Sequence, residues 1–216
     1  MLGALQLAFI DSVNLLLIGV IVAVGIAARS NYAKTTALLI AGDWCGVAGL
    51  ALIMLVIFDG LGPVVQRFVE GPVFGILLIA TGILTAVLAL RGGDNQALVQ
   101  KIMRPLHTPG PTTVATGVVL GLIQSATSVP FYGGLALLSA AGIEAQVRYA
   151  AIPLYATVAL SLPTLAALAV GWVRAKPHSA AARGFDWARA HPDQVTAAAT
   201  WAVAVLLIVL GVTHVM

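Results

Sequence analysis

Six long apolar segments divide the sequence, and short polar stretches separate them. They cover about residues 3–28, 35–58, 72–91, 113–140, 150–172 and 195–215. Each is close to the roughly 20 residues that an α-helix needs to cross the hydrocarbon core of a bilayer. The segments are continuously apolar rather than alternating, and backbone groups inside lipid must bond within their own segment, so helices are expected rather than strands. The pattern predicts an all-α integral membrane protein with six transmembrane helices.

Composition agrees with this prediction and narrows the chemistry. Of the 216 residues, 60% are hydrophobic and 9% are charged, whereas soluble domains carry about 25% charged residues. The Lys and Arg residues stand at the ends of apolar runs, so the net charge of +3 does not indicate nucleic-acid binding. The single cysteine, Cys45, excludes an internal disulfide or a dithiol redox pair and is expected to be a small packing residue. No cofactor is expected.

The positive charges predict an orientation. Nine of the 11 Lys and Arg residues fall on the first, third and fifth loops, and two fall on the second and fourth. Because positively charged loops remain in the cytoplasm, both termini are expected outside. The apolar run at the N-terminus lacks a basic region and is about 25 residues long, which is longer than the apolar core of a signal peptide. It is therefore expected to be a membrane span.

The two halves of the chain resemble each other. Residues 9–12 align with 122–125 at an offset of 113, and residues 77–83 align with 206–212 at an offset of 129. Three spans per half is an odd number, so the second half must cross the membrane upside down. Inverted repeats are common in secondary transporters, which bind substrate near the midplane on interrupted helices.

The expected organisation is a single transmembrane domain, 1–216, built from two inverted three-helix repeats. The first repeat covers about 1–91 and the second about 113–216. Between them, a Gly- and Pro-rich stretch at 92–112 is expected to be a cytoplasmic hinge loop.

Polar residues interrupt the first apolar segment at Asp11, Ser12 and Asn14. Asp11 is expected about 12 Å deep in the span at 1.5 Å per residue. A carboxylate at such depth costs on the order of 3 kcal/mol. We therefore expect Asp11 to face the protein interior or water.

The fourth apolar segment carries a matching polar cluster, which consists of Gln124, Ser125, Thr127, Ser128 and Pro130. Pro130 has no N–H and leaves a carbonyl near Ala126 without its usual helical partner. The segment is either unwound and lines a cavity, or its hydroxyl groups cap a proline kink and join neighbouring helices. The pairing with Asp11 in the other half favours the cavity.

Asp43, in the second segment, is the other deep carboxylate. Gly42 and Gly46 beside it allow another helix to approach closely, and Asp43 is expected to face Ser12 or Asn14 across that contact. Since no Lys or Arg lies deep within the spans, two carboxylates are hard to keep ionised together. Either a proton is shared and exchanged, which would couple transport to protons, or one Asp is a static protonated hydrogen-bond donor.

Two further features complete the pattern. Pro153 and Pro163 are expected to kink the fifth segment, and Tyr155 between them is expected to anchor at the membrane interface or to line the cavity. Gly117 and Gly121 in the fourth segment offer a second close-packing face, on which a homo-oligomer could form.

The break Asp11-Ser12-Val13-Asn14, the six helices and the duplicated plan resemble the LysE-type exporter superfamily, and within it the GAP (Sap-like) branch. The resemblance carries over to Asp11, Ser12 and Asn14, and in the second half to Ser125 and Pro130. It implies a multi-pass protein of the bacterial inner membrane, linked to export of cell-envelope glycolipids. The family has proline after the asparagine, whereas this chain has Leu15, so the first helix is expected to be less broken than in relatives.

Three functions fit these features. The first is a secondary transporter that exports a small solute or a cell-envelope (glyco)lipid precursor, with Asp11 as the proton-coupling group. The second is a divalent metal-ion exporter that uses Asp11, Asp43, Asn14 and carbonyl oxygens near Ala126. The third is a non-transporting accessory protein of an envelope-assembly complex. No nucleophile–base pair or phosphate-binding loop points to an enzyme, and the expected partners are membrane lipids and the substrate.

Overall fold

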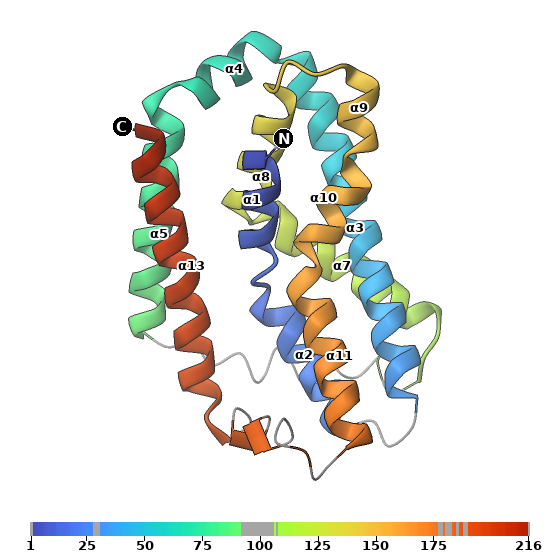
Figure 1. Cartoon of the computed structure of the whole chain (residues 1–216). Coiled ribbons are helices and arrows are strands. Elements are labelled where there is room, and N and C mark those ends of the chain that lie inside the picture. Colours follow the sequence, from blue (N-terminus) through green and yellow to red (C-terminus); the bar gives the residue numbers. More distant parts are fainter. Residues whose placement is uncertain are drawn as a thin grey trace.

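The computed structural model describes residues 2–27, 31–91, 106, 108–176, 179, 183–184, 186–187 and 190–215. These residues contain helices and no strand, which confirms the expected helical class. The long helices run side by side along one direction (Figure 1). Most of the predicted hinge loop, residues 92–105 and 107, lies outside the described residues.

Among the described residues, α3 (Tyr32–Gly60) is the one helix that is long and apolar enough to cross a membrane by itself. Four bent pairs of helices pass the same test together, so the described residues provide up to five spans by length and composition. The pairs are α1 (Leu2–Asp11) with α2 (Leu15–Ala27), α4 (Gly62–Glu70) with α5 (Pro72–Arg91), α7 (Pro111–Ala126) with α8 (Val129–Ser139), and α9 (Ala145–Ala150) and α10 (Ile152–Ala159) with α11 (Ser161–Ala175). The last predicted segment forms α13 (Pro192–Val215).

Several helices begin at a proline, because the first turn of a helix needs no N–H from that residue. Pro153 lies in the first turn of α10, and Pro163 follows the start of α11 at Ser161. The chain bends by 42° between α10 and α11. Residues 145–159, which include Pro153, form one arm of this bent pair, so the structure has one kink here, ahead of Pro163.

The helices α3 and α7 pack backbone to backbone. A Cβ atom on Gly42 would overlap the backbone of Val114, and Cβ atoms on Gly46, Gly117 and Gly121 would likewise overlap the backbone of the facing helix. The two small-residue faces seen in the sequence thus pack on each other. The expectation that the Gly42 face receives the first helix was wrong, and the face expected to be free for a second copy is covered by α3.

Glycines also bring α5 and α13 together, in antiparallel directions. A Cβ atom on Gly82 would lie 2.9 Å from the carbonyl oxygen of Ala204, and one on Gly211 would lie 2.7 Å from that of Gly75. Both Gly82 and Gly75 precede their counterparts Gly211 and Ala204 by 129 positions, the offset found in the sequence. The contact is therefore reciprocal, as a local two-fold axis perpendicular to the helices requires.

The amphipathic helix α4 falls on a predicted loop and crosses one end of the bundle between α3 and α5 (Figure 1). It meets α5 at 61°. Val65 on its inner face packs against Phe58 and Ala136, whereas Val64 is 66% exposed. A short helix with one apolar face of this kind is typical of a membrane interface.

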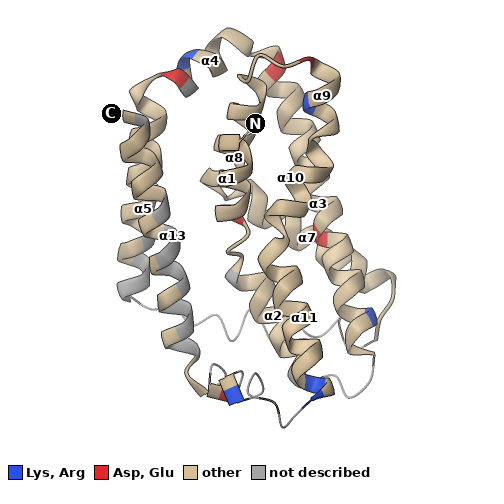
Figure 2. Cartoon of the chain, in the orientation of Figure 1, with Lys and Arg blue, Asp and Glu red and all other residues tan. Residues whose placement is uncertain are grey.

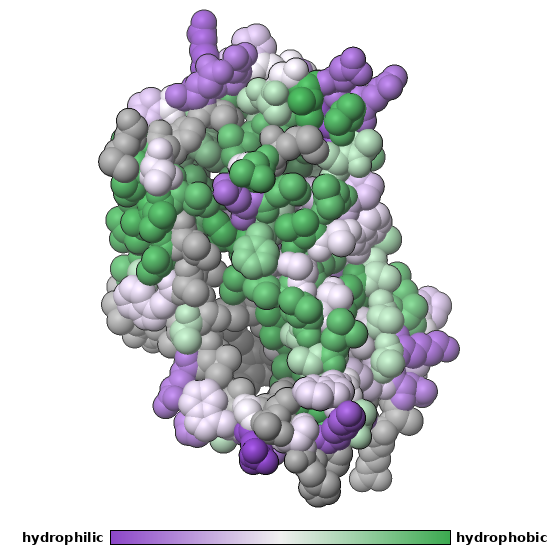
Figure 3. Space-filling model, in the orientation of Figure 1, coloured by the Kyte–Doolittle hydropathy of each residue, from purple (hydrophilic) through white to green (hydrophobic). Residues whose placement is uncertain are grey.

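Charge and hydropathy follow the long direction of the bundle. Most charged positions of the described residues lie near the two ends of the bundle (Figure 2), whereas Asp11 and Asp43 lie between them. On the face shown in Figure 3, mainly apolar side chains cover the region between the ends. Two buried apolar clusters fill the interior, one around Phe131 and Tyr155 and the other around Leu17 and Leu39. Along α3, Asp43 lies between the residues that belong to these two clusters, so a polar level separates two apolar ones.

Candidate functional site

The first helix break separates α1 from α2 over residues 12–14, with a bend of 49°. The Leu17 backbone N–H donates a hydrogen bond to Asn14 Oδ1 at 2.9 Å, which caps the new helix. The Ser12 hydroxyl donates to the carbonyl oxygen of Phe9 at 2.5 Å and so bonds to the end of the preceding helix. Side chains of the break therefore replace backbone bonds that a continuous helix would make.

The second break separates α7 from α8 at residues 127–128, with a bend of 76°. The Phe131 N–H donates to Ser128 Oγ at 3.2 Å, which caps α8. The Thr127 hydroxyl donates to the carbonyl oxygen of Ile123 at 3.0 Å. Pro130 lies in the first turn of α8, where its missing N–H costs little.

The two breaks are thus built alike. In each, one side chain caps the following helix (Asn14 or Ser128), and a hydroxyl bonds back to the preceding one (Ser12 or Thr127). Leu15 in place of a proline does not keep the first helix continuous, because the Asn14 cap stabilises a new start. The bend is nevertheless smaller than the one that precedes Pro130.

A hydrogen bond joins the two breaks directly. The Ser128 hydroxyl donates to Asp11 Oδ1, and Ser128 Oγ in turn accepts from the Phe131 N–H. Ser128 therefore fixes the carboxyl group of Asp11 and starts α8 at the same time. The α1–α8 packing that supports this contact is one of the main contacts between the two halves of the chain.

A cavity of about 290 Å³ lies where the breaks meet α3. Seven of the nine site residues expected from the sequence line it: Asp11, Asn14, Asp43, Gln124, Ser125, Thr127 and Ser128. Ser12 and Pro130 are buried beside it and do not line it. The apolar part of the lining includes Val47 and Leu160. The structure thus brings together polar groups from three distant parts of the chain.

Two side chains at the cavity have unpaired polar atoms. Asp43 is fully buried, and neither of its carboxyl oxygens has a hydrogen-bond partner among the described residues. Both polar atoms of the Gln124 amide are likewise buried and have no hydrogen-bond partner among the described residues. Burying such groups without partners costs about 1–3 kcal/mol each even when they are neutral. They are the groups best placed to bind a ligand or a proton in the cavity.

Three residues near the cavity differ from the sequence-based expectations. Tyr155 is 1% exposed and donates to the carbonyl oxygen of Phe131 at 3.2 Å, so it is a core residue and not an interface anchor. Cys45 is exposed on α3 and does not fill the interior. Asp43 reaches the cavity that Asn14 lines, but it does so from a helix packed on α7.

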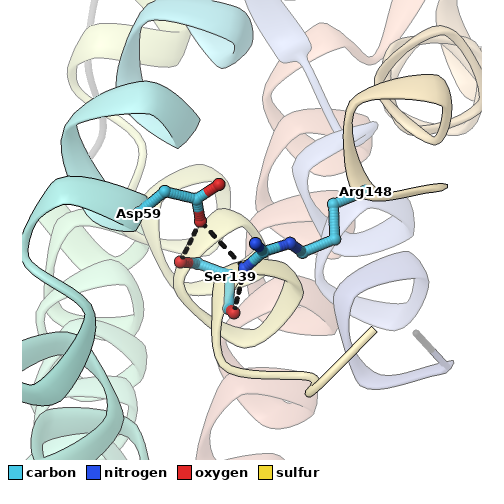
Figure 4. Close-up of polar contacts among 3 residues, drawn as sticks. All are labelled: Asp59, Ser139 and Arg148. Carbon is cyan, nitrogen blue, oxygen red and sulfur yellow. Dashed lines mark hydrogen bonds and ion pairs between the residues drawn. The ribbon is translucent and has the colours of Figure 1, made fainter. Parts of the chain in front are cut away.

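A second polar cluster, which sequence reasoning missed, closes one end of the bundle (Figure 4). Arg148 on α9 donates to Asp59 Oδ1 at 3.0 Å and to the carbonyl oxygen of Ser139 at 2.7 Å. The Ser139 hydroxyl donates to Asp59 at 2.6 Å. Three separate helices, α3, α8 and α9, are joined by this cluster. The sequence signal was present, since Asp59 ends one apolar segment and Arg148 precedes another.

One family model decides the relationship of this chain to known proteins. The model for Sap, the sulfolipid-1-addressing protein (SfLAP), matches residues 5–213. The chain belongs to the SfLAP family. No curated protein and no solved structure matches it. The family is membrane-associated, and together with the apolar helices this identifies a membrane protein.

Proposed function

We propose that this SfLAP family member is a secondary transporter that exports a cell-envelope lipid precursor through a six-span bundle of two inverted repeats. The observation that carries the proposal is the polar cavity formed where a break in each half meets the buried Asp43. Family membership supports a role in envelope lipid export or an accessory role in it. The LysE-type architecture indicated by the Asp11 break is part of this proposal.

The packing of the helices supports the inverted repeat. In the proposed duplication, the pair α1–α2 corresponds to α7–α8, α3 to α9–α11, and α5 to α13. The contact of α3 with α7 then has its counterpart in the contacts of α10 with α1 and α11 with α2, and all of these helices do pack on one another. The reciprocal glycine contact of α5 with α13 fits the same two-fold relation. We propose α13 as the sixth span.

The charge distribution supports a direction for the bundle. Lys34 lies at the start of α3, whose other end carries Asp59 of the Asp59–Arg148 pair, and Arg174 and Lys176 lie at the end of α11. Figure 2 shows basic positions at this end of the bundle. By the rule that basic loops stay in the cytoplasm, the Lys34 end faces the cytoplasm and both termini face outward. The proposed location is the bacterial inner membrane.

Asp11 and Asp43 supply the proposed coupling to protons. Both line one cavity, and none of the described residues that line it is Lys or Arg. Because two negative charges repel each other there, one proton is kept between the two carboxyl groups. Ser128 donates a hydrogen bond to Asp11 and so fixes the position of that carboxyl group, whereas the carboxyl oxygens of Asp43 have no hydrogen-bond partner among the described residues. Exchange of this proton with the aqueous phase would change the net charge of the cavity in which the substrate binds.

The test is lipid export by the purified protein in proteoliposomes under a proton gradient. Asp11→Asn keeps the shape of the side chain but cannot exchange a proton, and it is expected to abolish flux while thermal stability and expression persist. Glu144→Gln, an exposed carboxylate at the start of α9, is the matched control and is expected to transport normally. Undiminished flux in the Asp11 variant would sink the proposed role of this residue.

An accessory function is the second candidate, because the family description speaks of addressing a sulfolipid and not of moving it. It predicts no lipid flux by the protein alone and co-purification with a larger envelope-assembly partner.

Divalent metal export has less support. Among the described residues, no group of three or more His, Cys, Asp or Glu side chains is placed to hold a metal ion. An increase in melting temperature with Mn²⁺ would favour it.

A further inference from the structure

The helices α3 and α9–α11 are close at one end and splayed at the other. At the Asp59 end, α3 packs against α8 and α10 in the cluster around Tyr155, and the Asp59–Arg148 ion pair closes the contact. At the Lys34 end, an apolar groove of about 730 Å³ lies between α3 and α11. If α3 and α9–α11 are counterparts, the two ends are equivalent positions in opposite states, one closed and one open.

The groove is open along its length and almost entirely apolar. On α3 it runs from Tyr32 to Cys45, which is about 20 Å at 1.5 Å per residue and thus about two-thirds of the hydrocarbon core. Small exposed side chains, Ala37 and Ala41 among them, form part of its lining. By contrast, exposed residues farther along α3, such as Ile53, are bulky. The small side chains beside α11 therefore leave the outer surface of this helix hollowed there.

The groove adjoins the polar cavity. Trp44 lines the groove, and its neighbour Asp43 lines the cavity. On the other side, Leu160 lines the cavity and Thr164, one turn further along, lines the groove. An apolar chain in the groove would thus lie one residue along α3 from Asp43, whose carboxyl oxygens have no hydrogen-bond partner among the described residues.

Basic residues surround the open end of the groove. Lys34 lies in the first turn of α3 and is exposed. Lys176 follows the end of α11, and its Nζ atom lies 5.8 Å from the ring centre of Trp172, which lines the groove. An apolar channel with cations at the membrane surface matches the two parts of an anionic lipid.

We propose that this groove is a lateral docking site for an anionic membrane lipid, with an acyl chain along α3 and α11 and the charged head group at Lys34 and Lys176. This inference rests on the proposed lipid export, since it supplies the place where substrate leaves the bilayer for the cavity. The Asp59–Arg148 cluster closes the corresponding position at the opposite end in the state described here.

The experiment uses the full-length protein in phosphatidylcholine nanodiscs that contain a trace of phosphatidylglycerol with a photoreactive group in its acyl chain. After irradiation, adducts are mapped by peptide mass spectrometry and are expected within 32–45 and 164–172. Ala41→Trp fills the groove and is expected to reduce these adducts several-fold. Leu165→Trp is the matched control, because Leu165 is 58% exposed on α11 and does not line the groove.

The head-group assignment is tested with the same probe on a zwitterionic head group. Lys34→Gln with Lys176→Gln is expected to lower the preference for the anionic probe by about fivefold for each lysine. Adducts spread evenly over the outer faces of α3 and α11, or unchanged by Ala41→Trp, would mean ordinary bilayer contact and would overturn the docking site without touching the export assay. Groove adducts in a protein that exports no lipid would contradict the proposed function and leave the docking site standing.

Discussion

Ser128, in the break between α7 and α8, donates a hydrogen bond to Asp11, at the end of α1, across 117 positions of sequence. The bond explains how a carboxyl group is kept deep in an apolar bundle, because the hydroxyl that orients it is itself held by the N-terminus of α8. Both interrupted helices must therefore be in place before the Asp11 site exists.

The first prediction concerns this bond. Ser128→Ala removes the donor to Asp11 and the cap of α8, so it is expected to lower the free energy of unfolding by about 1–3 kcal/mol. Thr116→Ala, which removes a hydroxyl bonded only to the Thr112 carbonyl oxygen on the outside of α7, is the control and is expected to change it by less than about 0.5 kcal/mol. Thermal unfolding in detergent measures both. Equal effects would show that Ser128 contributes no more than an ordinary helix hydroxyl.

The glycine contact between α3 and α7 gives the second prediction. Gly42→Ala places a Cβ atom into the backbone of Val114, and since backbone cannot move aside cheaply, a loss of about 2 kcal/mol or more is expected. Gly49→Ala on the same helix meets nothing within 4 Å and is expected to be neutral or slightly stabilising. The melting temperatures of the two variants should differ clearly, and a Gly42 variant as stable as the Gly49 variant would contradict the packing.

The third prediction concerns the cluster in Figure 4. Arg148→Ala leaves Asp59 without its cation and is expected to cost about 1–3 kcal/mol, because both side chains are only 18% exposed. Adding salt should shrink the difference from the native protein, since partly exposed ion pairs are screened. Arg67→Ala, in α4 at the same end, serves as the control. A salt-independent loss would assign the effect to packing instead of charge.

The fourth prediction uses Cys45, which is the only cysteine of the chain. Because Cys45 is exposed on the outer side of α3 at the groove, an apolar maleimide is expected to label it in liposomes, whereas a membrane-impermeant charged thiosulfonate is not. Ala41→Trp in the same groove should slow the labelling. No reaction with either reagent, in liposomes or in detergent, would return Cys45 to the interior.

The sequence was most informative where polar residues interrupt apolar runs. Few positions inside an apolar bundle can accommodate a polar side chain. Asp11 and Gln124 could therefore be expected at one cavity from their matching positions in the two halves. The alignment offset of 129 likewise anticipated which glycines correspond in α5 and α13. The nine residues of α4 escaped notice because so short an amphipathic helix gives no long apolar run.

Partner choice was harder to anticipate. Gly42 and Gly117 both mark faces for close approach, but small-residue faces are nearly interchangeable, and only the three-dimensional packing shows that they meet each other. Tyr155 looked like an interface residue because it lies near the start of the predicted fifth segment. In the structure the helix breaks at Leu160, and α10, which precedes the break, lies in the core. The pairing of Asp59 with Arg148 could not be predicted, because it depends on how α9 folds back beside the end of α3.

The seam between α5 and α13 places Gly82 against Ala204 and Gly211 against Gly75, and the residues of one contact lie 129 positions from those of the other. A rotation by half a turn would therefore exchange these two contacts. Contacts with this property are those by which two identical subunits recognise each other. A larger side chain at either glycine would need a compensating hollow on the opposite helix, so these two surfaces are constrained to change together.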